Sequence, residues 1–246
     1  MENKKCLNCN STVNKNFCPN CGQKTSTHRF TFQHFLHDFL HGVFHLDKGF
    51  FFTLKKLFTR PGHSIREYLH GSRVNYFNAF TLIIILATIS HLITEYFKMD
   101  QTVLYEKKNQ INGYIKIARD HDKIIRLFRI PFYAFASYLL FKKSKQNYIE
   151  HLILNLYVAS GVIIITIFGN VFMECSNNII TLKIINYLIV LLILIYFYCF
   201  FYQYFSVFGY KKYALIIKCT LISFLILFIM SFLNNFINNV GLMHFK

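Results

Sequence analysis

Long apolar segments constrain this chain more than any other feature. A helix of about 20 apolar residues crosses a bilayer core roughly 30 Å thick. Charged residues make up 15% of the chain, against about 25% in soluble domains, so these segments indicate lipid surroundings. We therefore expect an all-α integral membrane protein with about five transmembrane helices. The predicted spans are about 77–97, 124–141, 152–173, 184–208 and 213–240, within a helical transmembrane domain of residues 77–246.

The segment at 124–141 is the least regular of the five. Arg126 and Arg129 shorten its apolar run, and Pro131 interrupts it. A re-entrant segment and a tilted helix kinked at the proline would both fit this pattern.

Basic residues in the short loops predict the orientation. Cytoplasmic loops carry an excess of lysine and arginine, and five spans place the two chain ends on opposite faces. The bias therefore puts the N-terminus in the cytosol and the C-terminus outside. The lysines on the predicted cytosolic side are Lys142, Lys143, Lys145, Lys211 and Lys212, against Lys183 and Lys246 on the other side.

Four cysteines in two identical steps precede the apolar part. Cys6 and Cys9 form the first step, and Cys18 and Cys21 form the second. Two Cys-x-x-Cys pairs around a short spacer are typical of a structural zinc ribbon, here residues 1–27. Four thiolates close the coordination shell, and so small a head would depend on the metal to fold. The polar N-terminus has no signal-peptide pattern, so we expect a reducing, cytosolic location.

Residues 28–76 form a patterned module between the ribbon and the first span. Apolar residues recur at helical spacing from Phe32 to Phe58, which predicts an amphipathic helix lying in the membrane interface. His34, His37 and His41 share its opposite face. This row is either a second metal site or pH-sensing face, or simply a solvated polar face.

The second half of the module is basic. Pro61 and Gly62 should end the long helix and turn the chain. Ser64 and Glu67 have the spacing of a capping box, and Gly71 is placed to close that short helix. Five cations are candidates for contact with anionic lipid at about 1 kcal/mol each, or are ordinary interface anchors: Lys55, Lys56, Arg60, Arg66 and Arg73.

The order of ribbon, module and multi-span body resembles an uncharacterised family of bacterial membrane proteins. Its members carry a domain of unknown function, often behind a zinc ribbon, and many have proline where this chain has Ala79. The resemblance implies a bacterial inner-membrane protein with no assigned activity. It covers about residues 6–85, and the matching positions are Asp47, Gly49, Thr53, Arg60, Pro61, Gly62, Tyr68, Gly71, Arg73 and Tyr76.

Polar residues within the predicted spans are sparse. His91 and Glu95 lie one turn apart near the outer end of the first span. They could form a polar path for an ion or proton, or Glu95 has simply reached the membrane interface. The sequence contains no phosphate loop, nucleophile elbow or HExxH motif, and nucleic acid is not an expected partner.

The pattern favours a membrane-anchored adaptor or regulatory protein rather than an enzyme. Its cytosolic zinc ribbon and basic module would bind a protein partner or the anionic lipid surface. The alternatives are a transporter or channel component with a path at His91 and Glu95, and a membrane enzyme with metal at His34, His37 and His41.

Overall fold

The structure is a computed structural model that describes residues 4–27, 29–32, 49–97, 108–176 and 178–244. Within these residues a two-stranded antiparallel sheet precedes a set of helices. The predicted histidine row at His34, His37 and His41 lies outside the described residues. The elements are β1 Lys4–Lys5, β2 Thr12–Val13, α2 Gly49–Thr59, α3 Pro61–Leu69, α4 Ala79–Tyr96, α5 Lys108–Leu140, α6 Tyr148–Met173, α7 Ile179–Phe205 and α8 Lys212–His244.

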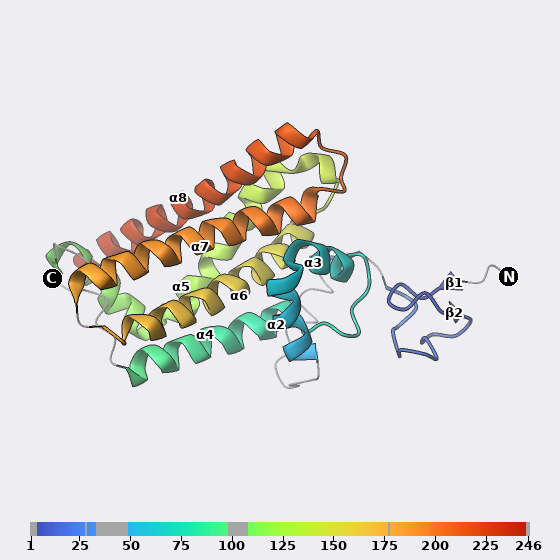
Figure 1. Cartoon of the computed structure of the whole chain (residues 1–246), viewed down its shortest axis with the longest axis horizontal. Coiled ribbons are helices and arrows are strands. Elements are labelled where there is room, and N and C mark those ends of the chain that lie inside the picture. The colour runs from blue at the N-terminus through green and yellow to red at the C-terminus, as the bar shows by residue number, and fades with distance from the viewer. Residues whose placement is uncertain (1–3, 28, 33–48, 98–107, 177, 245–246) are drawn as a thin grey trace.

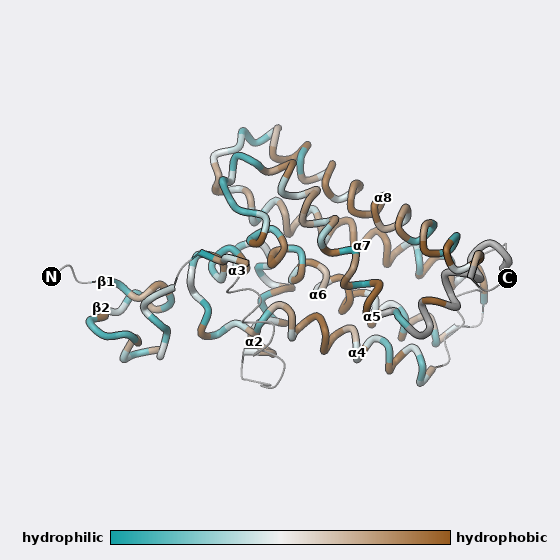
Figure 2. The backbone as a smooth tube through the Cα atoms, turned by 180° about the vertical axis from the view of Figure 1, so that it is seen from behind, coloured by the Kyte–Doolittle hydropathy of each residue, from teal (hydrophilic) through white to brown (hydrophobic). Residues whose placement is uncertain are grey.

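The long helices α4 to α8 lie side by side along the long axis of the molecule (Figure 1). The sheet lies beyond one end of this bundle, and α8 ends at the other. Hydrophobic residues concentrate in the long helices, whereas the segment around β1 and β2 is more hydrophilic (Figure 2). This distribution fits a body in lipid with a polar head at one end.

Four of the described helices are long and apolar enough to cross a membrane. They are α4, α6, α7 and residues Lys212–Met243 of α8, and each overlaps a predicted span. The chain is therefore a mostly helical membrane protein.

The predicted span at 124–141 forms the second half of α5, which is not among the four. Arg126 and Arg129 lie in this part of the helix, and Lys123 directly precedes it. Arg129 is buried and donates a hydrogen bond to Asn234 of α8. The non-helical backbone of α5 lies at His121, and Pro131, where a kinked helix was one of the two expectations, lies inside the helix.

The phenylalanine-rich core joins α5 to α7. Phe141, which follows α5, stacks on Phe205 of α7 with ring centroids 3.8 Å apart, and both rings are fully buried. Flat stacking of large rings buries apolar area and gives the helix ends a defined geometry. The same end of the bundle carries two short connections, at 141–147 and 206–211, and the lysines in and beside them are Lys142, Lys143, Lys145, Lys211 and Lys212.

Helices α2 and α3 lie at the end of the bundle where α6 begins. They have room there because α4 begins level with residues well inside α6 and not with its first residue. The Tyr157 hydroxyl donates to the Phe77 carbonyl at 2.6 Å, just before α4. Tyr157 is nine residues into α6, which is about 13 Å from its start. The Phe77 amide donates to Thr53 Oγ1 of α2 at 2.8 Å. These two bonds fix α2 across the end of the bundle (Figure 1).

Candidate metal centre and its attachment to the membrane body

Each cysteine step folds into the same small turn. The amide of Asn10 donates to the Cys6 carbonyl, and the amide of Gly22 donates to the Cys18 carbonyl, both at 2.9 Å. Asn10 and Gly22 directly follow the second cysteine of each step and both have positive φ, of 59° and 72°. Asparagine and glycine tolerate this left-handed backbone best. The sequence therefore turns each thiol pair inward locally.

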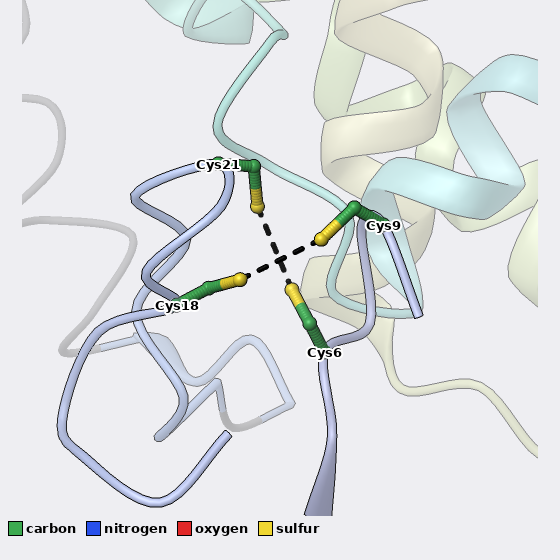
Figure 3. Close-up of side chains that lie close together, drawn as sticks. All are labelled: Cys6, Cys9, Cys18 and Cys21. Carbon is green, nitrogen blue, oxygen red and sulfur yellow. Dashed lines mark hydrogen bonds between the residues drawn. The ribbon is translucent and has the colours of Figure 1, made fainter. Parts of the chain in front are cut away.

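The four sulfurs converge on one point (Figure 3). Cys6 Sγ lies 3.6 Å from Cys21 Sγ, and Cys9 Sγ lies 3.5 Å from Cys18 Sγ. All four lie within 4.8 Å of one another and could hold a metal ion. Tetrahedral zinc with Zn–S bonds of about 2.3 Å requires sulfurs about 3.8 Å apart. The donor set and its spacing thus fit a closed thiolate site.

Hydrogen bonding and burial shift the pKa values of the thiols in opposite directions. The Ser11 hydroxyl lies 3.3 Å from Cys9 Sγ. This hydrogen bond, followed by that of the Ser11 backbone, lowers the pKa of Cys9 to about 6. Burial raises the pKa of Cys18 to about 11. Metal binding at this site requires thiolates, so it would release protons.

The cysteine head rests on the turn between α3 and α4. The backbone amides of Arg73 and Val74 both donate to Gln23 Oε1, at 3.1 and 2.9 Å. The Ser72 hydroxyl donates to Asn8 Oδ1 at 2.6 Å. Gly71 has a φ of 116°, and a Cβ there would lie 2.6 Å from Leu7 Cδ1. Glycine at this turn therefore allows both the backbone conformation and the close approach.

The segment after the head is fastened to α6. Arg29 donates from Nε to Glu150 Oε1 at 2.9 Å and from Nη2 to Glu150 Oε2 at 2.7 Å. The Glu150 side chain is 5% exposed. Phe30 is buried against the Tyr68 ring, and the Arg73 guanidinium lies 3.8 Å from the Phe30 ring centroid. Asn147 Nδ2 donates to the Phe30 carbonyl at 2.9 Å.

Four of the five predicted lipid-contacting cations make side-chain contacts within the chain. Arg66 Nη1 donates to the carbonyls of Gln203 and Tyr204 at 2.9 and 3.2 Å, and so caps the end of α7. Arg60 pairs with Glu67 at 3.2 Å. The guanidinium of Arg73 covers the Phe30 ring. Lys56 Nζ lies 5.2 Å from the Phe52 ring centroid. The fifth cation, Lys55, is exposed.

The predicted capping box at Ser64 and Glu67 is wrong, because the N-cap of α3 is Arg60, four residues before Ser64. Pro61 occupies the first turn, and the N-cap Arg60 makes no side-chain capping bond. Proline suits this position because the first helical amides have no partner within the helix. The expected helix end before Pro61 is confirmed at Thr59, and Gly71 follows the end of α3 with positive φ as expected.

A capping box does occur at the start of α6, where it was not predicted. Asn147 Oδ1 accepts from the Glu150 amide at 2.8 Å, and Glu150 Oε2 accepts from the Asn147 amide at 2.9 Å. The spacing Asn-x-x-Glu was visible in the sequence. Nothing local indicated that Glu150 also binds Arg29, 121 residues away.

The remaining predicted polar residues lie apart from this centre. His91 is half-buried in α4 and Glu95 is exposed near its end. A buried polar cluster lies instead between α5 and α6. Ser137 Oγ is 3.0 Å from His151 Nδ1 and accepts from Asn155 Nδ2 at 2.9 Å.

Comparison with known proteins shows a family similarity in one part of the chain. Residues 47–91 match a family described as "Protein of unknown function (DUF3667)". No curated protein and no solved structure matches the chain. The matched segment includes α2, α3 and most of α4, which supports the resemblance to an uncharacterised family in this region. Over these helices the chain is similar to a family of proteins of unknown function.

Proposed function

We propose that this protein is a membrane-anchored adaptor or regulatory protein. Its helices hold a zinc ribbon at the cytosolic surface, where the ribbon and the neighbouring basic residues bind a protein partner or anionic lipid. Cys6, Cys9, Cys18 and Cys21 would hold zinc, and their spacing supports this assignment. Four thiolates leave no open coordination position, so the ion would serve the fold of the ribbon.

The observation that carries this proposal is that residues next to the ribbon make contacts within the chain, whereas lysines of the ribbon itself are exposed. Residues of the matched segment make hydrogen bonds within the chain. Arg66 and the Gly62 amide bond to α7 and hold α3, and the Arg73 amide bonds to Gln23 of the ribbon. Among the described residues, the ribbon offers exposed lysines to a partner, namely Lys4, Lys5, Lys15 and Lys24, and Lys55 of the neighbouring basic set is exposed as well. An exposed cationic surface attracts an acidic protein segment or anionic lipid.

We further propose a bacterial inner-membrane location with the ribbon in the cytosol and the C-terminus outside. The connections at 141–147 and 206–211 lie at the ribbon end of the bundle with their neighbouring lysines, and α8 ends at the opposite end (Figure 1). This arrangement supports five crossings, with α5 as the fifth. A reporter enzyme that is active only outside the cytosol should work when fused after residue 246. Activity at residue 210 instead would contradict this orientation.

Co-purification from crosslinked native membranes tests the adaptor proposal. Replacing Cys6 and Cys9 by serine should abolish recovery of partner proteins while membrane insertion persists. Cys175→Ser is the matched control, because Cys175 is exposed and remote from the ribbon in sequence. Unchanged partners in the Cys6/Cys9 variant would overturn the proposal.

A second candidate function is that of a transporter or channel component. The observation that favours it is a set of polar side chains buried together in the bundle, Ser137, His151 and Asn155, rather than the predicted path at His91 and Glu95. Buried polar side chains between helices often mark a substrate route. Flux in proteoliposomes should then fall in His151→Ala and persist in His91→Ala. Equal flux in both variants would remove this candidate.

A further inference from the structure

The contacts between ribbon and body come from residues placed by the cysteine steps. Asn8 lies between Cys6 and Cys9, and Gln23 lies two residues after Cys21. Their side chains meet the turn at Ser72, Arg73 and Val74. The position of each contact therefore depends on how the thiols are held.

Arg73 belongs to two contacts at once. Its backbone amide donates to Gln23 Oε1, and its guanidinium lies over the Phe30 ring. Phe30 is 2% exposed and also stacks on Tyr68 of α3. A movement of Gln23 away from this turn would remove one support of the residue that covers Phe30.

Phe30 is adjacent to the ion pair that reaches α6. Arg29 holds both carboxylate oxygens of Glu150, and Glu150 Oε2 also accepts from the Asn147 amide. Asn147 in turn donates to the Phe30 carbonyl. The start of α6 and the segment 29–30 are thus joined in one hydrogen-bonded unit, which we call the latch: Arg29, Phe30, Asn147 and Glu150.

We propose that the metal state of the ribbon controls this latch. A loaded ribbon docks on the α3–α4 turn and keeps the latch closed, whereas an empty ribbon undocks and releases Arg29 and Phe30 from the cytosolic ends of α3 and α6. The inference rests on the metal site of the proposed function and regulates that same ribbon. It does not depend on which partner the ribbon binds.

The composition of the ribbon explains why the metal decides between the two states. Its buried residues are Cys6, Val13 and Cys18, with Cys9 and Cys21 partly buried against them. One valine is not a hydrophobic core, so the thiols must be held together by a metal ion for the head to keep its shape. The three docking hydrogen bonds alone would not fold it.

Hydrogen exchange of the full-length chain in nanodiscs tests the proposal, with metal content measured in every sample. The reporters are the amides of Arg73, Val74 and Asn147, which donate to side chains of the docking contact and the latch. Removing the metal with a chelator should speed exchange at all three by about tenfold, as expected when an amide loses its hydrogen bond. Re-adding zinc should restore the slow rates.

Three variants of the metal-loaded protein test the docking contact and the latch separately. Gln23→Ala should speed exchange at Arg73 and Val74, and Arg29→Ala should speed exchange at Asn147, both with unchanged zinc content. Lys24→Ala is the matched control and should leave all three amides slow. Chelation effects confined to residues 4–27, or reaching Arg73 and Val74 but not Asn147, would overturn the proposal. The assay contains no partner, so a failure of the adaptor proposal would not change it.

Discussion

Gly62 is the residue at which α3 comes closest to α7. A Cβ there would lie 2.3 Å from the Phe200 carbonyl oxygen and 2.4 Å from the Tyr204 amide nitrogen. Both neighbours are helix backbone and cannot rotate away. We expect Gly62→Ala to lower the free energy of unfolding by about 1–3 kcal/mol, as forced packing usually does. Thermal unfolding in detergent measures this change.

Ala79→Pro provides the control for that measurement. Ala79 is the first residue of α4, and Asn78 before it has φ −59° and ψ 133°, which suit a residue preceding proline. The Asn78 side chain caps the amides of Phe80 and Thr81, not that of Ala79. The variant should therefore match the wild type within about 1 kcal/mol. Equal losses in both variants would contradict the close approach at Gly62.

His63 in α3 should make the stability of the protein depend on pH. Burial, followed by the charges of Arg66 and Arg60, lowers its pKa below the usual value of about 6.5. Arg66 Nη2 lies 2.9 Å from His63 Nδ1, as fits a neutral ring that accepts a hydrogen bond. The unfolded chain then binds a proton that the folded chain does not, so stability falls as pH drops through about 6.5.

The measurement is the unfolding temperature between pH 7.5 and pH 5.5. His63→Gln should flatten its fall with decreasing pH, because glutamine does not titrate. Glu67 also faces this site and acts in the opposite direction, as its carboxylate favours a charged His63. An identical pH profile in the variant would show that His63 contributes nothing to the effect.

At the scale of the element, α2 presents opposite faces to the protein and to its surroundings. Phe50, Thr53 and Leu57 are buried, whereas Phe51 is 76% exposed and Phe58 is 49% exposed. A helix lying across the bundle end with exposed phenylalanines fits the membrane interface. The chain contains no tryptophan, so a Phe51→Trp variant carries a single fluorescent reporter.

We expect lipids brominated near the headgroup to quench the fluorescence of the Phe51→Trp variant more strongly than lipids brominated deep in the acyl chain. The matched control is Val74→Trp, since Val74 is 43% exposed on the turn beside the ribbon and an indole there should escape quenching. Equal quenching in both variants, or none in either, would place α2 elsewhere.

The elements also show what sequence patterns can and cannot predict. The cysteine steps, the helix end at Thr59 and four spans follow local spacing, and the structure contains each of them. The roles of Arg66 and Arg73 were not predictable, because a juxtamembrane arginine has the same sequence signature whether it contacts lipid or caps a helix. Partners such as Gln203 and Phe30 are distant in sequence and become visible only after folding.

For the whole molecule, a zinc ion held by the four cysteines would contribute more to folding than the docking contacts do. Structural zinc contributes about 10–16 kcal/mol to the folding of small peptides, whereas each docking hydrogen bond contributes about 0.5–1.5 kcal/mol. The membrane body should therefore stay folded without metal while the ribbon does not. The ribbon could then unfold and refold with its metal while the membrane body keeps its structure.

Zinc stoichiometry tests the central claim most directly. Elemental analysis of the purified chain, reloaded with zinc and desalted, should give one zinc per chain. Cys18→Ser should lose it, whereas Cys175→Ser and the triple replacement of His34, His37 and His41 by alanine should keep it. A second zinc lost with the three histidines would instead favour a metal site on the histidine row. Retention of zinc by Cys18→Ser, or a chain that binds none, would contradict a thiolate ribbon.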